Sequence, residues 1–404
     1  MSHHSPNKKR KTKKQREQEL LAEFEQALVE LAEPRRRQGI RYPLRSVVTI
    51  GLMAMVCGAD DAQAMQLWGE ANEEWLDELL DLPHGTPTQD VFLAVFAALN
   101  PEEFSQVFAQ WVKLLLWRKD GDAKHIAIDG KTNRRTFDKA NNQPAVHVVS
   151  AWLRDEGLVL GQISTDKKSN EITAIPDLLR LIDLRGATVT IDAMGCQTKI
   201  AEEIVRQGGD YLLAVKDNQP TLAWDIELTF ADALDSSPRS DDQPRPLPVE
   251  TTSETAQGHG RVEKRTVYVC RDLFFLSTAN RWPGLAFVAM VVSTRTNNST
   301  GKSSTKRRYY IGSDATASAA KIAGNIRCHW GIENNLHWVL DMAFNEDQAR
   351  HRAGNCAKNF ATLRHFAINL IRGDKKTKAG IANKRKRAGW DRRYLLQLLA
   401  GDFS

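Results

Sequence analysis

The 404-residue chain lacks several features that would place it in a special class of protein. No uninterrupted apolar run is long enough to cross a bilayer, and the polar, basic N-terminal stretch has no apolar segment of the signal-peptide kind. We find no internal repeat. These absences predict a cytoplasmic protein with no membrane partner. The five cysteines form no CxxC pair, and their odd number and wide scatter exclude a disulfide framework, so we expect reduced thiols mostly in the core: Cys57, Cys196, Cys270, Cys328 and Cys356.

What the chain does have is a sizeable apolar content and an excess of positive charge. Hydrophobic residues make up 42% of the chain, which at this length predicts two or three structural units. The net charge of +6 suits a polyanionic partner. Flexible basic ends can neutralise phosphates without reading sequence, although the same charges could merely aid solubility. Much of the excess lies near the two ends, in the runs 8–11, 13–14, 35–37 and 384–387.

The first part of the chain, residues 20–115, is predicted to be helical. The breaker cluster 82–87 separates two of these helices, with Thr88 as a plausible N-cap of the second. Such a pair could be a helix-turn-helix reader of DNA or an ordinary helical hairpin, in which Val91, Phe92, Val95 and Phe96 would be packing residues. Apolar periodicity places the helices at 20–31, 44–57, 62–80 and 88–99.

From about residue 122 the pattern changes to short strands, which then alternate with helices. This order predicts a mixed sheet with helices packed on its faces. The polar, proline-rich stretch 236–248 is predicted to be a loop, and 249–314 a β-rich insertion built on short runs at 266–270, 285–293 and 308–311. Helical periodicity returns over 317–371, and one last short helix follows at 393–399. The earlier strands are expected at 125–129, 145–153, 158–164, 187–192 and 211–216, with helices at 172–184, 199–207 and 222–234.

Two of the predicted strands end in an acidic residue. Asp129 and Asp192 each follow a strongly apolar run, so the sheet would position their carboxylates. Two such acids on neighbouring strands repel each other unless they share a cation. Hard oxygen ligands favour magnesium or manganese over zinc.

A third acid, Glu333, lies on a patterned helix. An apolar stripe is expected along Ile332, Leu336, Val339 and Ala343, and a neighbouring stripe carries His329, Glu333 and His337. Glu333 could instead form a surface ion pair. A zinc site made by Cys328, His329 and His337 lacks a known ligand spacing. Trp330 and Trp338 could stack on a flipped base, but beside Ile332 and Leu336 we expect them in the core.

Seven separated sequence blocks occur in an order that is very specific to one family. The chain resembles the H-repeat-associated insertion-sequence transposases, part of the DDE group with a ribonuclease-H-like catalytic fold, from about residue 20 to 370. The blocks are RYPL (41–44), AIDGK (127–131), EITAIPDLL (171–179), IDAMGCQ (191–197), DYLLAVKDNQ (210–219), GHGRVEKR (258–265) and HWGIENNLHWVLDMAFNEDQARHR (329–352).

The resemblance implies that Asp129, Asp192 and Glu333 are the catalytic metal ligands, holding two Mg²⁺ ions, or Mn²⁺, in each active site. In related DDE families the glutamate lies in a tyrosine–arginine–glutamate–lysine pattern. Here Ile326, His329 and Leu340 stand at the other three positions, so the contacts of those missing residues cannot be transferred. Each of the weaker DNA-binding candidates could equally be an ordinary surface charge or a helix cap. They are Lys131, Lys216, Asn218, Arg261, His329 and His337.

The sequence therefore predicts an α/β enzyme: a ribonuclease-H-like mixed sheet flanked by helices, with an N-terminal helical domain and a β-rich insertion before the catalytic glutamate helix. We expect a nucleoid-associated DNA transposase that cuts transposon ends and joins 3′-hydroxyls to target DNA. It would act on double-stranded DNA as a dimer or higher oligomer. The alternatives are an inactive or domesticated transposase that only binds DNA, and a general metal-dependent nuclease. Expected domains are a basic tail (1–19), an N-terminal helical, DNA-binding domain (20–118), a catalytic domain (122–235 and 315–372), an insertion (236–314) and a basic C-terminal tail (373–404).

Overall fold

The computed structural model describes residues 22, 24–38, 40–80, 82–117, 125–138, 144–165, 171–234, 246–258 and 260–400. The predicted basic tail 1–19 and most of the predicted loop 236–248 lie outside these residues. The chain divides into two compact units. Unit 1 comprises Met1–Lys119, Thr132–Val148 and Trp338–Ser404, and unit 2 comprises Asp120–Lys131 and Val149–His337. No helix in the described part of the chain is long and apolar enough to cross a membrane.

Unit 1 is built of helices around α12 (Cys356–Gly373), which is buried on almost every side. The ring of Phe366 contacts the rings of Phe24, Phe104, Phe108 and Trp111, so aromatic packing fills the centre of this unit. The helical N-terminal region is confirmed. Its further helices are α2 (Leu44–Val56), α3 (Ala62–Glu70), α4 (Glu73–Leu80), α5 (Gln89–Ala98), α6 (Pro101–Trp117), α11 (Trp338–Phe344), α13 (Ile381–Trp390) and α14 (Arg392–Leu399).

Two details of these helices differ from the sequence-based expectation. The single helix expected over 62–80 is broken between α3 and α4, where Asn72 donates from Nδ2 to the carbonyl of Trp68 (2.8 Å) and so competes with the helical hydrogen bonds. The segment expected as a helix to Leu31 ends in a short 3₁₀ turn, η1 (Leu28–Glu30).

The helices α4 and α5 are separated at the predicted breaker cluster, but α5 packs against α2, α3 and α12, so α4 and α5 do not form a packed hairpin. Thr88 occupies the N-cap position of α5, but its side chain makes no capping hydrogen bond. Phe92, Val95 and Phe96 are fully buried and Val91 is half-buried, which fits the packing interpretation. Because α5 also contains no lysine or arginine, it offers no cationic side chains for the phosphates that flank a DNA groove.

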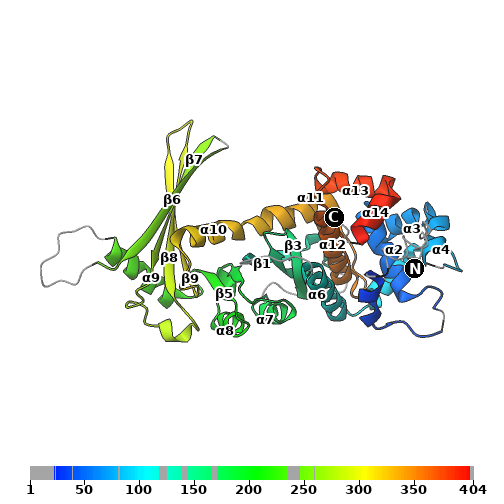
Figure 1. The fold of residues 1–404 in the computed structure, drawn as a ribbon, viewed down its shortest axis with the longest axis horizontal. Coiled ribbons are helices and arrows are strands. Elements are labelled where there is room, and N and C mark those ends of the chain that lie inside the picture. Colours follow the sequence, from blue (N-terminus) through cyan, green and yellow to red (C-terminus); the bar gives the residue numbers. More distant parts are fainter. Residues whose placement is uncertain are drawn as a thin grey trace, which may run out of the picture. The chain divides into compact units, whose positions relative to one another are not determined.

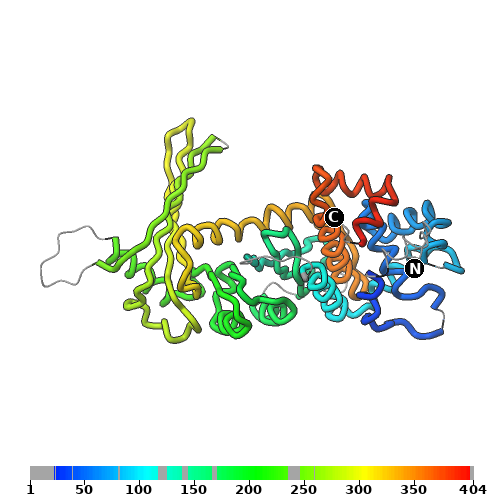
Figure 2. The backbone as a smooth tube through the Cα atoms, viewed as in Figure 1, coloured from blue at the N-terminus to red at the C-terminus, as the bar shows by residue number. Residues whose placement is uncertain are grey.

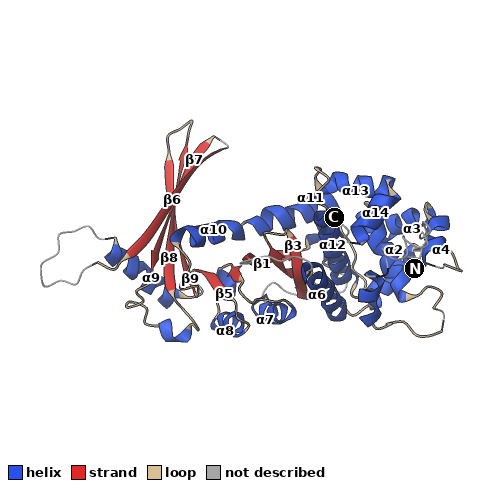
Figure 3. Cartoon of the chain, in the orientation of Figure 1, coloured by secondary structure: helices blue, strands red, loops and turns tan. Residues whose placement is uncertain are grey.

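Unit 2 is organised by a nine-stranded sheet with the strand order β3-β2-β1-β4-β5-β9-β8-β7-β6. The strands β1, β4 and β5 pair in parallel, and β5 pairs antiparallel with β9. The mixed, helix-flanked, ribonuclease-H-like sheet is thereby confirmed. Figure 1 shows α7 (Glu171–Leu181) and α8 (Thr198–Arg206) next to each other beneath the strands, and Figure 3 shows the strands in red. The first five strands are β1 (His125–Thr132), β2 (His147–Leu153), β3 (Leu158–Thr165), β4 (Thr188–Ile191) and β5 (Asp210–Val215).

The β-rich insertion extends the same sheet instead of forming a separate one. Its strands are β6 (Val249–Gly258), β7 (Arg261–Cys270), β8 (Phe287–Asn297) and β9 (Ser303–Gly312), and the last three are longer than the predicted runs. Strand β6 was missed because most of its residues are polar and exposed, which leaves no apolar alternation to read. Figure 2 traces the hairpins β6–β7 and β8–β9 to tips that extend beyond the other strands of this unit.

The helix α10 (Ala319–His329) packs on one face of the extended sheet. Its residues Ile322 and Ile326 share a buried cluster with Val267, Val291 and Tyr310 from three strands. Apolar burial therefore fixes α10 and the segment that follows it against the sheet.

The C-terminal segment is not the basic tail expected for 373–404. The run 384–387 forms part of helix α13, which falls where the sequence showed no clear pattern, and within it Lys384 and Arg385 are buried. Arg385 donates to Asp60 Oδ1 (2.6 Å) and to the carbonyl of Met55 (2.6 Å), and its guanidinium lies 4.1 Å from the ring centroid of Phe344. Lys384 also pairs with Asp374 (3.7 Å). Half of this basic run therefore stabilises unit 1.

Replacing Arg385 should accordingly destabilise the protein. Arg385→Ala leaves Asp60 and the Met55 carbonyl without their buried partner, and we expect the free energy of unfolding of unit 1 to fall by about 3–5 kcal/mol. Urea unfolding followed by tryptophan fluorescence measures the change. The matched control is Lys386→Ala, an exposed position on the same helix, which should cost about 0.5 kcal/mol or less. Equal effects of the two variants would contradict the structural role of Arg385.

Candidate active site

The first two candidate acids follow paired positions of adjacent parallel strands. Ile128 of β1 is the register partner of Ile191 of β4, so the next residues lie side by side: Asp129 within β1 and Asp192 directly after β4. Strand β1 continues to Thr132, beyond the strand end that the sequence predicted at Asp129. Asp192 is also the N-cap of the 3₁₀ turn η4 (Ala193–Gly195), where its Oδ1 accepts from the backbone N–H of Met194 (3.0 Å) and of Gly195 (3.4 Å). A Cβ on Gly195 would clash with the side chain of Ile191, which explains the small residue in this turn. The local fold thus fixes the carboxylate of Asp192 and brings Asp129 next to it.

Glu333 lies at a local change in helix geometry. The helical run that follows α10 passes through a π-helical turn, η6 (Glu333–His337), before continuing as α11. Such turns are often found at functional sites. The extra residue in the turn shifts the buried stripe: Ile332 and Leu336 are buried as predicted, but Leu340 and Phe344 are buried in place of Val339 and Ala343.

Three side chains converge at this point. Ligand atoms of Asp129, Glu333 and His337 all lie within 4.8 Å of one another. The Nδ1 of His337 is 3.1 Å from Glu333 Oε2 and 3.6 Å from Asp129 Oδ2. His337 is buried whereas the side chain of Glu333 is 66% exposed, so the histidine supports the glutamate from the protein side.

The ring proton of His337 can be assigned from its surroundings. Its Nε2 is buried and has no hydrogen-bond partner within the described residues. In the neutral ring one nitrogen carries the proton, and Nδ1 is the nitrogen that faces two carboxylates. The proton therefore belongs on Nδ1, where it can be donated to Glu333.

The carboxyl of Asp129 has an unusual pKa. Burial, the largest effect, raises this pKa to about 6; His337 and the backbone N–H of Gly130 lower it, and the negative charges of Asp192 and Glu171 raise it. A carboxylate whose negative charge is disfavoured mainly by burial is stabilised when a cation binds next to it. The position therefore favours either a proton or a metal ion.

All three candidate acids line one pocket of about 350 Å³. Of the weaker candidates, Lys216 and His329 also line this pocket. The donor set, rich in carboxylate oxygens, fits a hard divalent cation. The possible metal-binding group found among the described residues consists of Asp129, Glu333 and His337, so it includes neither Cys328 of the zinc interpretation nor Asp192. Asp192 is joined to the other two acids by lining the same pocket.

His329 is held in a chain of hydrogen bonds to the sheet. Its Nδ1 lies 3.1 Å from Thr190 Oγ1, and His125 Nε2 lies 3.2 Å from the same hydroxyl. Burial lowers the pKa of both rings, that of His125 to about 4, although Asp192 opposes the change at His329. Both rings are therefore neutral at pH 7, and His329 adds no charge to the pocket.

The other three sequence candidates take different positions. The amide of Asn218 donates to the carbonyl of Ala193 (2.7 Å) and so supports the turn that holds Asp192. Lys131 is half-buried on β1, two residues beyond Asp129. Arg261 is exposed at the start of β7 and does not line the pocket.

Some pocket residues were missed or misread in the sequence. Arg308 and Tyr310 of β9 line the pocket, but their run of basic and aromatic residues looked like an ordinary strand. The expectation that Trp330 and Trp338 belong to the core was wrong, since their exposed fractions are 51% and 59%. The π turn and the end of α10 direct these positions outward, although their neighbours Ile332 and Leu336 are buried.

Comparison with known proteins places this combination of sheet and acidic pocket in a family. The family described as Transposase DDE domain matches residues 120–370, and a family described as associated with that domain matches residues 25–112. The chain belongs to the DDE transposase family, in its H-repeat-associated group.

The chain is similar over most of its length to two proteins of Escherichia coli (strain K12). It is 38% identical to the "H repeat-associated putative transposase YhhI" and 39% identical to the "Putative protein YbfL", each alignment covering 90% of this chain and 93% of the relative. A solved piggyBac transposase synaptic complex with hairpin DNA is far more distant, with 11% identity and a TM-score of 0.39 over 96% of this chain and 80% of that one. That likeness is too weak to support an inference.

The pKa of Asp129 leads to a test in metal-free buffer. The pKa of Asp129 in the folded protein, about 6, exceeds its ordinary value of 3.8, which applies to the unfolded chain. The protonated carboxyl therefore stabilises the fold at low pH, and this contribution is lost as the pH rises from about 4 to 6. Asp129→Asn should therefore leave stability nearly unchanged at pH 4 and raise the free energy of unfolding at pH 7. The gain should reach roughly 3 kcal/mol, at about 1.4 kcal/mol for each pH unit between the two pKa values. Denaturant unfolding with a chelator present, repeated across this range, measures the difference. A pH-independent difference would contradict the raised pKa.

Proposed function

We propose that this protein is an active transposase that cuts the ends of a DNA element and joins the freed 3′-hydroxyls to target DNA. The observation that carries the proposal is the arrangement of Asp129, Asp192 and Glu333 around one pocket, with two of the acids on adjacent parallel strands. In this proposal the three carboxylates hold two divalent ions, Mg²⁺ or Mn²⁺. When bound, the ions would activate the attacking oxygen and stabilise the leaving one.

The protein's own residues position and neutralise charge. Asp192 is fixed by two backbone N–H groups, and Asn218 holds the same turn through Ala193. Lys216 lines the pocket and supplies a cation where a phosphate would lie. Because ions and side chains do this work by positioning, no covalent bond between protein and DNA is needed.

The proposed partners are the two double-stranded ends of the element and the target duplex. Joining two ends in one event favours a dimer or higher oligomer. The competing function is a non-catalytic DNA-binding protein. That alternative would be favoured by a missing carboxylate, and all three are present.

The central test removes the charge of Glu333 but keeps its shape. Glu333→Gln should reduce DNA cleavage and strand transfer in Mg²⁺ by roughly 10²–10³-fold or more, while duplex binding persists. Gel assays on DNA carrying the element's ends measure both steps. Glu227→Gln, an exposed acid on α9 (Pro220–Ala233) outside the pocket, is the matched control and should cut normally. A Glu333→Gln protein that cuts at the normal rate would remove this glutamate from the site.

His337 is proposed as a positioning residue, because Mg²⁺ prefers oxygen ligands and Nδ1 is within hydrogen-bond distance of Glu333. His337→Ala should raise the half-saturating Mg²⁺ concentration by roughly 10- to 100-fold, as expected when a residue that orients a ligand is lost. Saturating Mg²⁺ should restore much of the rate, which distinguishes this variant from Glu333→Gln. Calorimetric titration with Mn²⁺ gives a readout independent of cleavage. The exposed His84→Ala is the control, and an unaltered metal midpoint in His337→Ala would contradict the role.

A further inference from the structure

The sheet of unit 2 has two edges, and they differ in what covers them. Strand β3 forms one edge; it is buried along most of its length, and α7 packs against it. Strand β6 forms the other edge, and eight of its ten residues are exposed. Within the described residues β6 pairs with β7 alone. An antiparallel strand directs about half of its N–H and C=O groups away from its neighbour, so β6 presents a row of backbone groups without a strand partner.

The outer edge of β6 lacks the features by which edge strands usually avoid pairing. Proline, lysine, a bulge or a very short strand each hinder the approach of a second strand. The ten residues of β6, VETTSETAQG, contain neither proline nor lysine. Their register with β7 runs without a bulge from Val249 opposite Cys270 to Gly258 opposite Arg261. Such an edge is a template for pairing with another chain.

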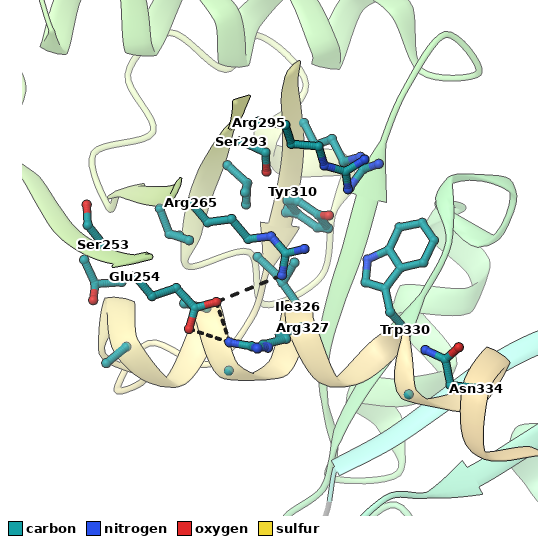
Figure 4. Close-up of a pocket in the computed structure, with 18 residues that line it drawn as sticks. Ser253, Glu254, Arg265, Ser293, Arg295, Tyr310, Ile326, Arg327, Trp330 and Asn334 are labelled. Carbon is teal, nitrogen blue, oxygen red and sulfur yellow. Dashed lines mark hydrogen bonds and ion pairs between the residues drawn. The ribbon is translucent and has the colours of Figure 1, made fainter. Parts of the chain in front are cut away.

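The two acids of β6 do not hinder such pairing, because both are engaged by the protein's own residues. Glu250 accepts a hydrogen bond from the backbone N–H of Ala319 (2.7 Å). Glu254 pairs with Arg327 at 2.6 Å, and Figure 4 shows its carboxylate directed toward Arg327 and Arg265. The negative charge of Glu254 is therefore compensated within one copy of the protein.

On the other face of the sheet, β6 carries hydroxyl side chains. Ser253 Oγ lies 2.9 Å from Thr266 Oγ1 on β7. Thr251 and Thr255 share the face of Ser253, because alternate residues of a strand point the same way. Cross-strand pairs of threonine and serine stabilise antiparallel sheets. The edge therefore offers hydroxyls as well as backbone groups to a further strand of the same kind.

A second copy of β6 is a strand that fits this edge. A two-fold axis between the Ser253 residues of two copies would place Thr251 of each copy opposite Thr255 of the other. Hydroxyls then face hydroxyls, and no acid faces an acid. Moving the axis by one residue in either direction would place Glu250 opposite Glu254, or Glu254 opposite its own counterpart. Like charges directly opposite each other are destabilising, so charge selects the register centred on Ser253.

We propose that the protein forms a symmetric dimer in which β6 pairs antiparallel with β6 of a second copy, about an axis at Ser253. The joined edges make one sheet that is continuous across the two copies. No residue of β6 lines the acidic pocket, so the interface is separate from the three carboxylates. The inference goes beyond the proposed function, because this dimer needs neither metal nor DNA to form. It would supply the two active sites that the joining of two DNA ends requires.

Disulfide trapping tests the register in the full-length protein without DNA. Directly opposite residues of antiparallel strands have Cβ atoms about 4.5–5.5 Å apart, close to the spacing in a disulfide. Ser253→Cys should therefore form a covalent dimer under mild oxidation with oxidised glutathione, visible on a non-reducing gel. The unsubstituted protein, whose cysteines are buried or half-buried, gives the background.

Thr255→Cys is the matched control, since it places a thiol on the same face of the same strand. In the proposed register the two copies of residue 255 lie about 13 Å apart along the strands, too far for a disulfide. Thr255→Cys should therefore not crosslink alone. Mixed with Thr251→Cys protein, it should crosslink as a heterodimer, because residues 251 and 255 of different copies are directly opposite.

A charge placed on the axis tests the interface by a second route. Ser253→Glu sets two acids opposite each other and should raise the dissociation constant of the dimer, measured by sedimentation equilibrium, about 5-fold or more. Ser253→Lys should act in the same way, and an equal mixture of the two variants should restore dimers by pairing opposite charges. Ser299→Glu adds the same charge to the exposed turn between β8 and β9 and should leave the dissociation constant unchanged.

The outcomes separate this interface from the proposed function. A monomeric protein, or a Ser253→Cys variant that crosslinks no faster than Thr255→Cys, would overturn the interface even if the protein cuts DNA. A dimer unaffected by Ser253→Glu would also overturn it, because the contact would then lie elsewhere. A dimer with the Ser253 register in a protein unable to cleave would retain the interface and overturn the catalytic proposal.

Discussion

The parallel pairing of β1 with β4 is the constraint on which the rest of the site depends. Because Ile128 and Ile191 are register partners, Asp129 and Asp192 lie next to each other although 62 residues lie between them in the sequence. A slip of one residue would turn one of the two carboxylates to the other face of the sheet. Burial of the apolar strands makes such a slip costly, so the hydrophobic core keeps two mutually repelling acids next to each other.

The sequence was most informative where physical patterns are strong. Strands that are buried on both faces read as continuous apolar runs, and Asp192 could therefore be placed at the end of β4 from the sequence alone. Asp129 was also expected to end its strand, but β1 continues to Thr132 through residues that show no apolar pattern. Glu333 was less readable, since its helix pattern also allowed a surface ion pair, and the family resemblance was needed to select it. The π turn could not be predicted, because the insertion of one residue into a helical turn is set by tertiary packing. That turn is what moved Leu340 and Phe344 into the stripe expected for Val339 and Ala343.

Charge was the least reliable guide to structure. The basic run in α13 has the composition of a DNA-binding tail, yet Lys384 and Arg385 are buried against acids and carbonyls of unit 1. The polar strand β6 gave the opposite error, since its residues suggest a loop but its backbone completes the edge of the sheet. The composition of a segment indicates how readily its residues are solvated by water. Whether a charged or polar segment is ordered depends instead on partners that are distant in the sequence.

The helix α10 connects the parts of unit 2 that matter for function. One side of it, with Ile322 and Ile326, is part of the core beneath the extended sheet. Its end presents His329 to Thr190 and Trp330 to Arg308, and the π turn with Glu333 follows directly. Any shift of α10 along the sheet would therefore change the position of the glutamate and the width of the pocket between α10 and strands β6–β9 at the same time. The extended sheet acts through this helix, because its apolar face anchors α10.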